Sequence, residues 1–377
     1  MTASELKAPF PWFGGKRRVA SIVWAALGNP DSYVEPFAGS LAVLLARPAD
    51  QVAGAVETVN DADAYLENFW RALAADPDAV AAACDWPVNE TALIARHLWL
   101  VNEGRRRIAS MEADPDFFDA KVAGWWVWGI NSWIGAGWCK GDGPWHAING
   151  EVVKLDRSDR PDPPDSCVKR KLPHLGAGRG VNRKLPHLGN AGQGVNRQRP
   201  TLGYEGMSTD KLAPDALHFY FRALSARLRR VRVCCGDWTR VLTDGATAYG
   251  DSVGLFLDPP YLGDVRTRDL YRIDDHSLSI AVRDWAIARG RDPRFRIVLA
   301  GYHAEHADAM PPDWREMRYA ANASYQTAAR AAAGTGGNMD RRHNESLWFS
   351  PACSGGAFAL GAATACPLFP DPEPSNA

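Results

Sequence analysis

The sequence predicts an α/β fold in which helices cover both faces of a mostly parallel sheet. Two stretches carry this prediction, because strand-like apolar runs alternate there with apolar positions at helical spacing. The first stretch covers residues 33–73, and the second begins after residue 214 and ends near residue 350. Residues 76–205 break the alternation. We therefore expect one sheet, interrupted by a large insertion, in a chain of 377 residues.

The first stretch predicts two strand–helix units. Tyr33 and Val34 are typical of a short strand, and an apolar run with helical character follows the segment Pro-Phe-Ala-Gly. A second strand is expected at residues 52–56. Helical spacing then returns at five apolar residues, Tyr65, Leu66, Phe69, Trp70 and Leu73.

The second stretch continues the pattern. One apolar helical stripe is formed by Leu217, Phe221, Leu224 and Leu228. Strands are expected at VRVCCGD (231–237), VGLFLDPPY (253–261), RFRIVLAGY (294–302) and ESLWFSP (345–351). A helix at residues 274–290 should begin with Asp274 or Asp275 as its N-cap. The tail, residues 351–377, is rich in alanine, glycine and proline, and we expect it to be flexible.

Acidic residues follow the predicted strands. Glu35, Asp237 and Asp258 lie at or just past strand ends, and Asp61 follows the expected second strand. Ligands of open parallel sheets bind outside the carboxyl ends of the strands. The four carboxylates therefore predict one ligand site at that edge of the sheet.

The segment Asp258-Pro259-Pro260-Tyr261 has a chemistry of its own. The Asp258 carboxylate only accepts hydrogen bonds, and the rigid prolines can hold the Pro259 carbonyl pointing outward. Two adjacent acceptors suit an exocyclic amino group, and Tyr261 offers a ring for stacking on a flat base. The alternative is a structural Pro-Pro loop with a buried tyrosine.

Two glycine-containing loops could approach a ligand closely. The loop EPFAGS (35–40) joins a strand to an apolar run but lacks the glycine spacing of a dinucleotide site and the Gly-Lys-Ser/Thr of a phosphate loop. PWFGGK (11–16) can offer backbone amides and the Lys16 cation to a carboxylate or phosphate. Asp61 can accept from ribose hydroxyls or, alternatively, cap the helix that follows it.

These motifs and their order resemble the Dam-like N6-adenine DNA methyltransferases. The set comprises PWFGGK, YVEPFAGS, VNDAD, CGDW, LFLDPPY, DDHSL and ESLWFS, and it covers roughly residues 8–145 and 205–350. The resemblance implies a Rossmann-like methyltransferase sheet that binds S-adenosylmethionine. It also implies methyl transfer to the amino group of adenine in a specific duplex DNA sequence, after base flipping.

The resemblance assigns roles to particular residues. Cofactor-binding positions are Trp12, Lys16, Glu35, Pro36, Phe37, Ala38, Gly39, Asp61, Asp237 and Asp258, with Lys16 near the methionine carboxylate. Catalytic positions are Asp258, Pro259, Pro260 and Tyr261. The chain departs from the family where Ser40-Leu41 follow Gly39 in a loop that usually carries a second glycine, and where Trp133 stands in place of a phenylalanine.

The chain divides into a catalytic domain of residues 1–75 and 206–350 and a target-recognition insertion of residues 76–205. The insertion includes a helical stretch near 91–111, a tryptophan-rich segment and a basic, glycine-rich repeat at 170–199. Residues 166–204 hold eight lysines and arginines and no acidic residue, which suits a phosphate backbone. Expected DNA contacts are Trp133, Lys140, Arg170, Lys171, Arg179, Arg183, Lys184 and Arg197. The alternative for the repeat is a flexible, solvated loop.

Most of the tryptophans at 125–138 are expected in the core, and Trp133, Trp138 and Trp145 are the candidates for DNA contact.

Rival functions are an N4-cytosine methyltransferase, an RNA or protein-glutamine methyltransferase, and a catalytically silent DNA-binding protein. The net charge of the chain is close to zero, so the overall charge predicts no particular binding partner. The odd number of cysteines argues against a disulfide framework, and the lack of a long apolar run predicts a cytoplasmic protein without a membrane partner. A monomer is the default expectation, and direct methyl transfer needs no metal. The resemblance alone implies a bacterial or phage-infected cell.

Overall fold

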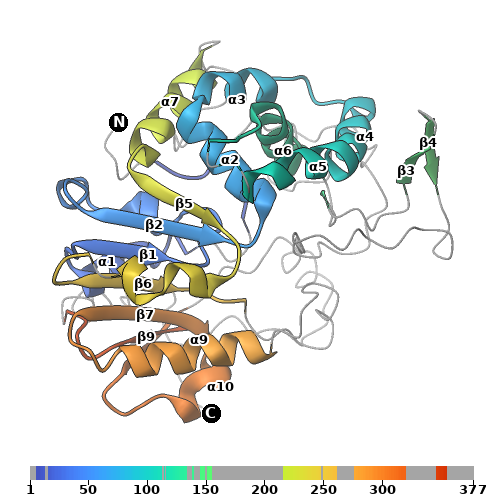
Figure 1. The fold of residues 1–377 in the computed structure, drawn as a ribbon. Coiled ribbons are helices and arrows are strands. Elements are labelled where there is room, and N and C mark those ends of the chain that lie inside the picture. The colour runs from blue at the N-terminus through green and yellow to red at the C-terminus, as the bar shows by residue number, and fades with distance from the viewer. Residues whose placement is uncertain are drawn as a thin grey trace, which may run out of the picture.

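The computed structural model confirms the α/β fold (Figure 1). It describes residues 6–12, 16–112, 114, 116–133, 138–139, 145–148, 151–154, 215–247, 249–260, 276–319 and 345–354. Within these residues the chain forms a seven-stranded sheet of order β5-β2-β1-β6-β7-β9-β8 and a separate hairpin of β3 and β4. The strands are β1 (Ser32–Glu35), β2 (Val56–Asp61), β3 (Trp145–Ile148), β4 (Glu151–Lys154), β5 (Val231–Cys235), β6 (Val253–Leu257), β7 (Phe295–Tyr302), β8 (Arg315–Tyr319) and β9 (Glu345–Phe349).

The strand order reverses between β1 and β6. From β1 the chain adds β2 and then β5 on one side, whereas β6 and β7 extend the sheet on the other, and all five strands are parallel. β9 then runs antiparallel between β7 and β8. The boundary between β1 and β6 is therefore the switch point of the sheet, where open α/β sheets bind their ligands.

Side chains of the central strands alternate between two apolar clusters. Phe256 and Val298 belong to one cluster, called the first cluster below, whereas Leu255 and Ile297 belong to the second cluster. Since successive side chains of a strand point to opposite faces, the two clusters mark the two faces of the sheet. The first face is covered by α1 (Ala20–Leu27), α2 (Ala64–Ala75) and α7 (Ala216–Leu228), and the second by α9 (His276–Arg289).

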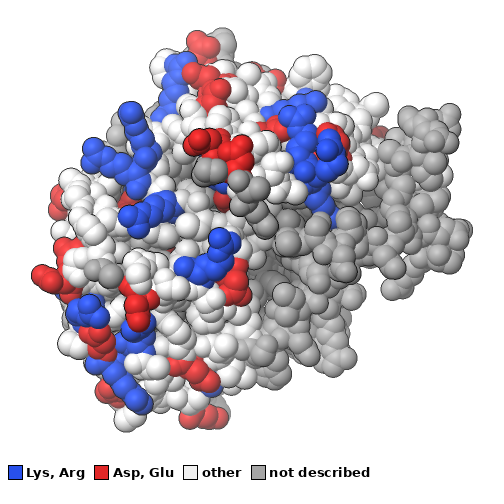
Figure 2. Space-filling model, in the orientation of Figure 1, with Lys and Arg blue, Asp and Glu red and all other residues white. Residues whose placement is uncertain are grey.

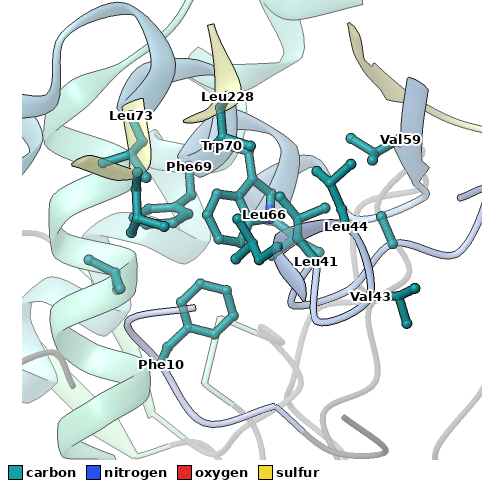
Figure 3. Close-up of a cluster of buried hydrophobic side chains, with 14 of the residues drawn as sticks. Phe10, Leu41, Val43, Leu44, Val59, Leu66, Phe69, Trp70, Leu73 and Leu228 are labelled. Carbon is teal, nitrogen blue, oxygen red and sulfur yellow. The ribbon is translucent and has the colours of Figure 1, made fainter. Parts of the chain in front are cut away.

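The first cluster is rich in aromatic rings. Figure 3 shows Phe10, Phe69 and Trp70 beside Leu66 and Leu73 of α2. Phe10 meets Phe69 edge to face, with ring centroids 5.4 Å apart, and its centroid lies 5.6 Å from that of Trp70. The N-terminal segment is thereby fixed against α2, which brings the residues that follow it to the sheet.

Part of the expected insertion shares this cluster. Val80, Leu93 and Trp126 belong to it, and they come from α3 (Pro77–Cys84), α4 (Glu90–Trp99) and α6 (Ala120–Ser132). α6 contacts both α2 and α3, and α3 contacts α7. Between α4 and α6 the chain continues through the π-helical turn η4 (Leu100–Gly104), α5 (Arg105–Ile108) and the 3-10 helix η5 (Ala109–Glu112). These helices are therefore continuous with the core of the sheet domain.

Two local predictions in the first stretch are wrong. The run after Gly39 forms turns and the short 3-10 helix η2 (Leu44–Ala46), because Leu41 adopts a φ of 55°, which no α-helix accommodates. The second strand begins at Val56, because residues 52–54 form a turn in which Gly54 has a φ of 84°, and it ends with Asp61. The helical stripe at residues 217–228 is confirmed, and its four residues are buried.

Several elements were not predicted. They are α1, η3 (Ala49–Gln51), α3, α6, β3, β4, η8 (Trp238–Val241), α8 (Asp244–Thr247), α10 (His303–His306), η10 (Ala307–Ala309) and β8. The basic repeat, most of the tail, and the N-cap predicted at Asp274 or Asp275 lie outside the described residues. Among the helices that the structure describes, none has the length and apolar character needed to cross a membrane.

Candidate functional site

Three of the four predicted strand-end acids lie at adjacent strand ends. Glu35 is the last residue of β1, Asp61 is the last residue of β2, and Asp258 directly follows β6. These strands are neighbours in the order β2-β1-β6, so the three carboxylates share the carboxyl edge at the switch point. Asp237 follows β5, the next strand beyond β2.

Lys16 joins the N-terminal motif to the Asp-Pro-Pro motif. Its Nζ lies 3.0 Å from Oδ1 of Asp258 and 3.7 Å from Oε2 of Glu345, the first residue of β9. Lys16 is buried, with 6% of its surface exposed. A buried ammonium is stable only beside compensating charge, which the two carboxylates provide.

Glu35 is buried beside this ion pair. Its Oε2 accepts hydrogen bonds from the Tyr33 hydroxyl at 2.9 Å and from the Leu44 amide at 3.2 Å. Burial, with a smaller contribution from the negative charge of Asp258, raises the pKa of the Glu35 carboxyl to about 8. Near neutral pH the Glu35 carboxyl is therefore mostly protonated.

Gly39 is held from three sides. Its amide donates to Oδ2 of Asp61 at 3.0 Å, and its carbonyl accepts from Nε1 of Trp70 at 3.3 Å. On the third side, a Cβ atom at Gly39 would come within 2.5 Å of Nε1 of Trp12. Its φ of 49° lies in the left-handed region that favours glycine. The loop after β1 is therefore fixed in a conformation that requires glycine at this position.

Asp61 connects two loops, and its alternative role as a helix cap is wrong. Its Oδ1 accepts from the Asp63 amide at 3.0 Å, while Oδ2 holds Gly39. The N-cap of α2 is Asp63, whose side chain accepts from the amides of Tyr65 and Leu66. Asp61 is thereby oriented by the loop that resembles a cofactor-binding loop.

Asn60 holds Pro36 and Ala38 of the loop after β1 in place. The sequence reasoning missed this residue. Nδ2 of Asn60 donates to the carbonyls of Pro36 and Gly236, both at 3.0 Å, and the Asn60 carbonyl accepts from the amide of Ala38. Asn60 thus ties the loop after β1 to the loop after β5. The sequence signal that could have identified Asn60 is a polar asparagine just past the predicted second strand, directly before Asp61.

Asp237 lies beside a flat aromatic pair. It is the N-cap of η8, and its Oδ1 accepts from both the amide and the hydroxyl of Thr239. Phe37 and Trp238 stack next to it, with ring centroids 6.2 Å apart and an angle of 28° between their planes. Trp238 is a second residue that the sequence reasoning did not select, although it directly follows Asp237 in the CGDW motif.

The side chains at this edge fit the functional groups of S-adenosylmethionine. Lys16 is a buried cation for a carboxylate, and the oriented carboxylate of Asp61 accepts hydrogen bonds, as ribose hydroxyls require. Asp237 can accept from an amino group next to the flat surface of Phe37 and Trp238. None of the His, Cys, Asp and Glu side chains described by the structure gather in groups of three that could hold a metal ion.

Of the predicted catalytic residues, Asp258, Pro259 and Pro260 are described, and Tyr261 lies outside the described residues. Asp258 is partly exposed, with 18% of its side chain accessible. Pro259 is buried, and its ring restricts the backbone just after Asp258.

The predicted DNA contacts are described only in part. Trp133 stacks on His97 with ring centroids 4.9 Å apart and an interplanar angle of 22°, at the margin of the first cluster. Trp138 is not available for DNA, because it is buried and its Nε1 donates to the carbonyl of Trp126. Seven further predicted contacts lie outside the described residues: Lys140, Arg170, Lys171, Arg179, Arg183, Lys184 and Arg197. On the face in Figure 2, basic and acidic side chains of the described residues are interspersed.

Comparison with known proteins agrees with the motif pattern. Residues 12–96 match the family model of D12 class N6 adenine-specific DNA methyltransferases. This confirms the resemblance to Dam-like adenine methyltransferases, and the matched segment contains Trp12, Lys16, the loop at residues 35–39 and Asp61. No curated protein matches the chain.

Proposed function

We propose that the chain transfers a methyl group from S-adenosylmethionine to the N6 amino group of adenine in duplex DNA. The contact between Lys16 and Asp258 carries the proposal. Lys16 lies inside the segment that matches the adenine methyltransferase family, whereas Asp258 lies far outside it in sequence. Their ion pair brings the matched segment and the Asp-Pro-Pro motif to one place at the switch point of the sheet.

The cofactor would lie along the carboxyl ends of β1, β2 and β5. Lys16 would bind the methionine carboxylate, Asp61 the ribose hydroxyls, and Asp237 the amino group of the cofactor's adenine. Trp12 and the loop at residues 35–39 would line the same path, with Phe37 and Trp238 beside the adenine ring. S-adenosylmethionine, when bound, would supply an electrophilic methyl group on its sulfonium sulfur, and the sulfur would keep the electron pair of the broken sulfur–carbon bond and leave as a neutral sulfide.

Asp258 and the Pro259 carbonyl would bind the target amino group. Two hydrogen bonds from that group to oxygen acceptors draw its nitrogen lone pair out of the aromatic ring and make it available for attack. After the nitrogen–carbon bond forms, the nitrogen must lose one proton. A methylated amino nitrogen that still carries this proton is a strong acid, so the Asp258 carboxylate suffices as acceptor. Positioning of the two partners supplies much of the remaining rate.

A base inside duplex DNA must leave the stack before it can reach Asp258. Extrusion costs a few kcal/mol, and stacking of the base on Tyr261 would offset part of this cost. We propose that residues 76–205 recognise the target sequence and that the protein acts as a monomer. The basic repeat, with Lys140 and Trp133, would follow the phosphate backbone.

The test is incubation of the purified chain with labelled S-adenosylmethionine and mixed-sequence DNA, followed by nucleoside analysis. We expect label in N6-methyladenine. Label in N4-methylcytosine would instead support an N4-cytosine methyltransferase, and no label would support a catalytically silent DNA-binding protein. Asp258→Ala should abolish transfer, whereas Asp292→Ala removes an exposed turn carboxylate and should leave transfer unchanged.

A further inference from the structure

Glu345 lies at the proposed site but comes from the far end of the chain. It is the first residue of β9, and in the sheet it is the cross-strand partner of Tyr302 on β7 and of Tyr319 on β8. β9 is the strand inserted antiparallel between these two neighbours. Its first residue therefore lies at the edge where the parallel strands end, which is the edge that holds Asp258.

Hydrogen bonding and charge fix the Glu345 carboxylate. The Tyr319 hydroxyl donates to Oε2 of Glu345 at 2.7 Å, and the same oxygen lies 3.7 Å from Nζ of Lys16. The carboxylate also acts on Tyr302, whose phenol pKa is raised chiefly by burial and further by this negative charge. Only 13% of the Glu345 side chain is exposed. Glu345 is therefore a partly buried anion whose position is set by two strands.

Lys16 thus lies between two carboxylates with different tasks. Asp258 is the closer partner, at 3.0 Å, and it is also the group to which the target amino group would bind. An amino group that binds Oδ1 of Asp258 would compete with Lys16 for that oxygen. A buried ammonium that loses a partner is strongly destabilised. The methionine carboxylate that the proposed function assigns to Lys16 belongs to an exchanging ligand, whereas Glu345 is a fixed carboxylate of the protein. Glu345 can therefore keep Lys16 in place during the exchange.

We propose that Glu345 is a positioning residue that anchors the Lys16 ammonium while Asp258 engages the target base. The inference rests on the proposed function, since it assigns Asp258 to the base. Glu345 itself touches neither the base nor the methyl group. Its action through Lys16 predicts an effect on the rate of transfer and no effect on the affinity for DNA.

The first measurement needs no activity. In the cofactor-free protein, acetylation of Lys16 by an N-hydroxysuccinimide ester is followed by mass spectrometry. Loss of a carboxylate beside the ammonium should speed labelling of Lys16 about threefold in Glu345→Gln. Tyr319→Phe, which keeps the carboxylate but removes its hydrogen bond, should give a smaller increase. Glu316→Gln is the matched control, because Glu316 lies on the adjacent strand β8 and contacts His303 and Ser346.

The second measurement is steady-state methylation of DNA by the same variants, corrected for the folded fraction by thermal unfolding. Glu345→Gln should lower kcat about three- to tenfold with KM for DNA unchanged, and Glu345→Asp should restore part of the rate. Unchanged Lys16 labelling in Glu345→Gln, or loss of rate without rescue by Glu345→Asp, would overturn the inference. A wild-type chain that methylates no adenine would instead overturn the proposed function, while the labelling result would still decide whether Glu345 anchors Lys16.

Discussion

The indole of Trp12 lies so close to Gly39 that a side chain at Gly39 has no room. An added Cβ atom would come within 2.5 Å of Nε1 of Trp12, and the φ of 49° at Gly39 strains any other residue. The N-terminal motif and the loop after β1 are therefore packed as one unit, held also by Asp61 and Trp70.

Gly39→Ala should weaken binding of S-adenosylmethionine about tenfold or more, because both the loop and Trp12 must move. Tryptophan fluorescence or calorimetry would measure the dissociation constant. Two alanine variants separate the causes. Gly54 has a φ of 84° with nothing within 4 Å, so Gly54→Ala introduces only strain. Gly245 has open space and no strained φ, so Gly245→Ala should be silent. Equal affinities for all three variants would contradict the close packing of Trp12.

Glu35 should make stability depend on pH. The pKa of its carboxyl is about 8 in the folded protein and 4.5 without the effects of the fold. Because the folded state holds the proton more tightly, the stabilisation is complete below about pH 4.5 and is lost as the pH rises through about 8. Glu35→Gln keeps an oxygen acceptor for Tyr33 and Leu44 but cannot ionise, so it should remove this dependence.

Denaturant unfolding of wild type and Glu35→Gln at several pH values would measure the effect. We expect the variant to gain stability over wild type as the pH rises from 5 to 8. Parallel stability curves for the two proteins would show that Glu35 does not titrate in this range.

Leu41 presents two opposing effects. Its φ of 55° costs about 1–2 kcal/mol for a residue with a side chain, which glycine would relieve. Its side chain is fully buried in the first cluster, and removing a buried leucine costs about 2–5 kcal/mol. Burial is the larger effect, so Leu41→Gly should lower the free energy of unfolding by about 1–3 kcal/mol. A stabilised variant would show that backbone strain at the departure from the family pattern outweighs packing.

The basic repeat should supply part of the salt dependence of DNA binding. Residues 166–204 contain eight lysines and arginines, and each phosphate contact contributes roughly 0.9 to the slope of log affinity against log salt. Deletion of residues 167–200 should weaken binding and flatten this slope. A chain with the same residues changed from lysine or arginine to glutamine keeps the length and should show the same flattening. An unchanged slope would show that the repeat does not contact the phosphates and would favour the alternative of a solvated loop.

Much of the fold could be predicted because its signals are local. The helical stripe at Leu217 and Leu228 and the strand before Asp258 follow from hydrophobic spacing within about a dozen residues. The two predicted elements that were wrong concern backbone geometry. A positive φ at Leu41 ends the predicted helix, and no spacing rule anticipates it, because the buried side chain stabilises a conformation that leucine rarely adopts.

The sequence by itself determined that acids stand at strand ends, that a glycine loop follows the first strand, and that an Asp-Pro-Pro motif ends a buried strand. The tertiary structure alone decided that β6 lies beside β1 and that β9 returns antiparallel between β7 and β8. Lys16, Asp258 and Glu345 meet only through that arrangement. The physical reason is that strand order is set by long-range packing and hydrogen bonding between segments, whereas each segment's own pattern records only which of its faces is buried.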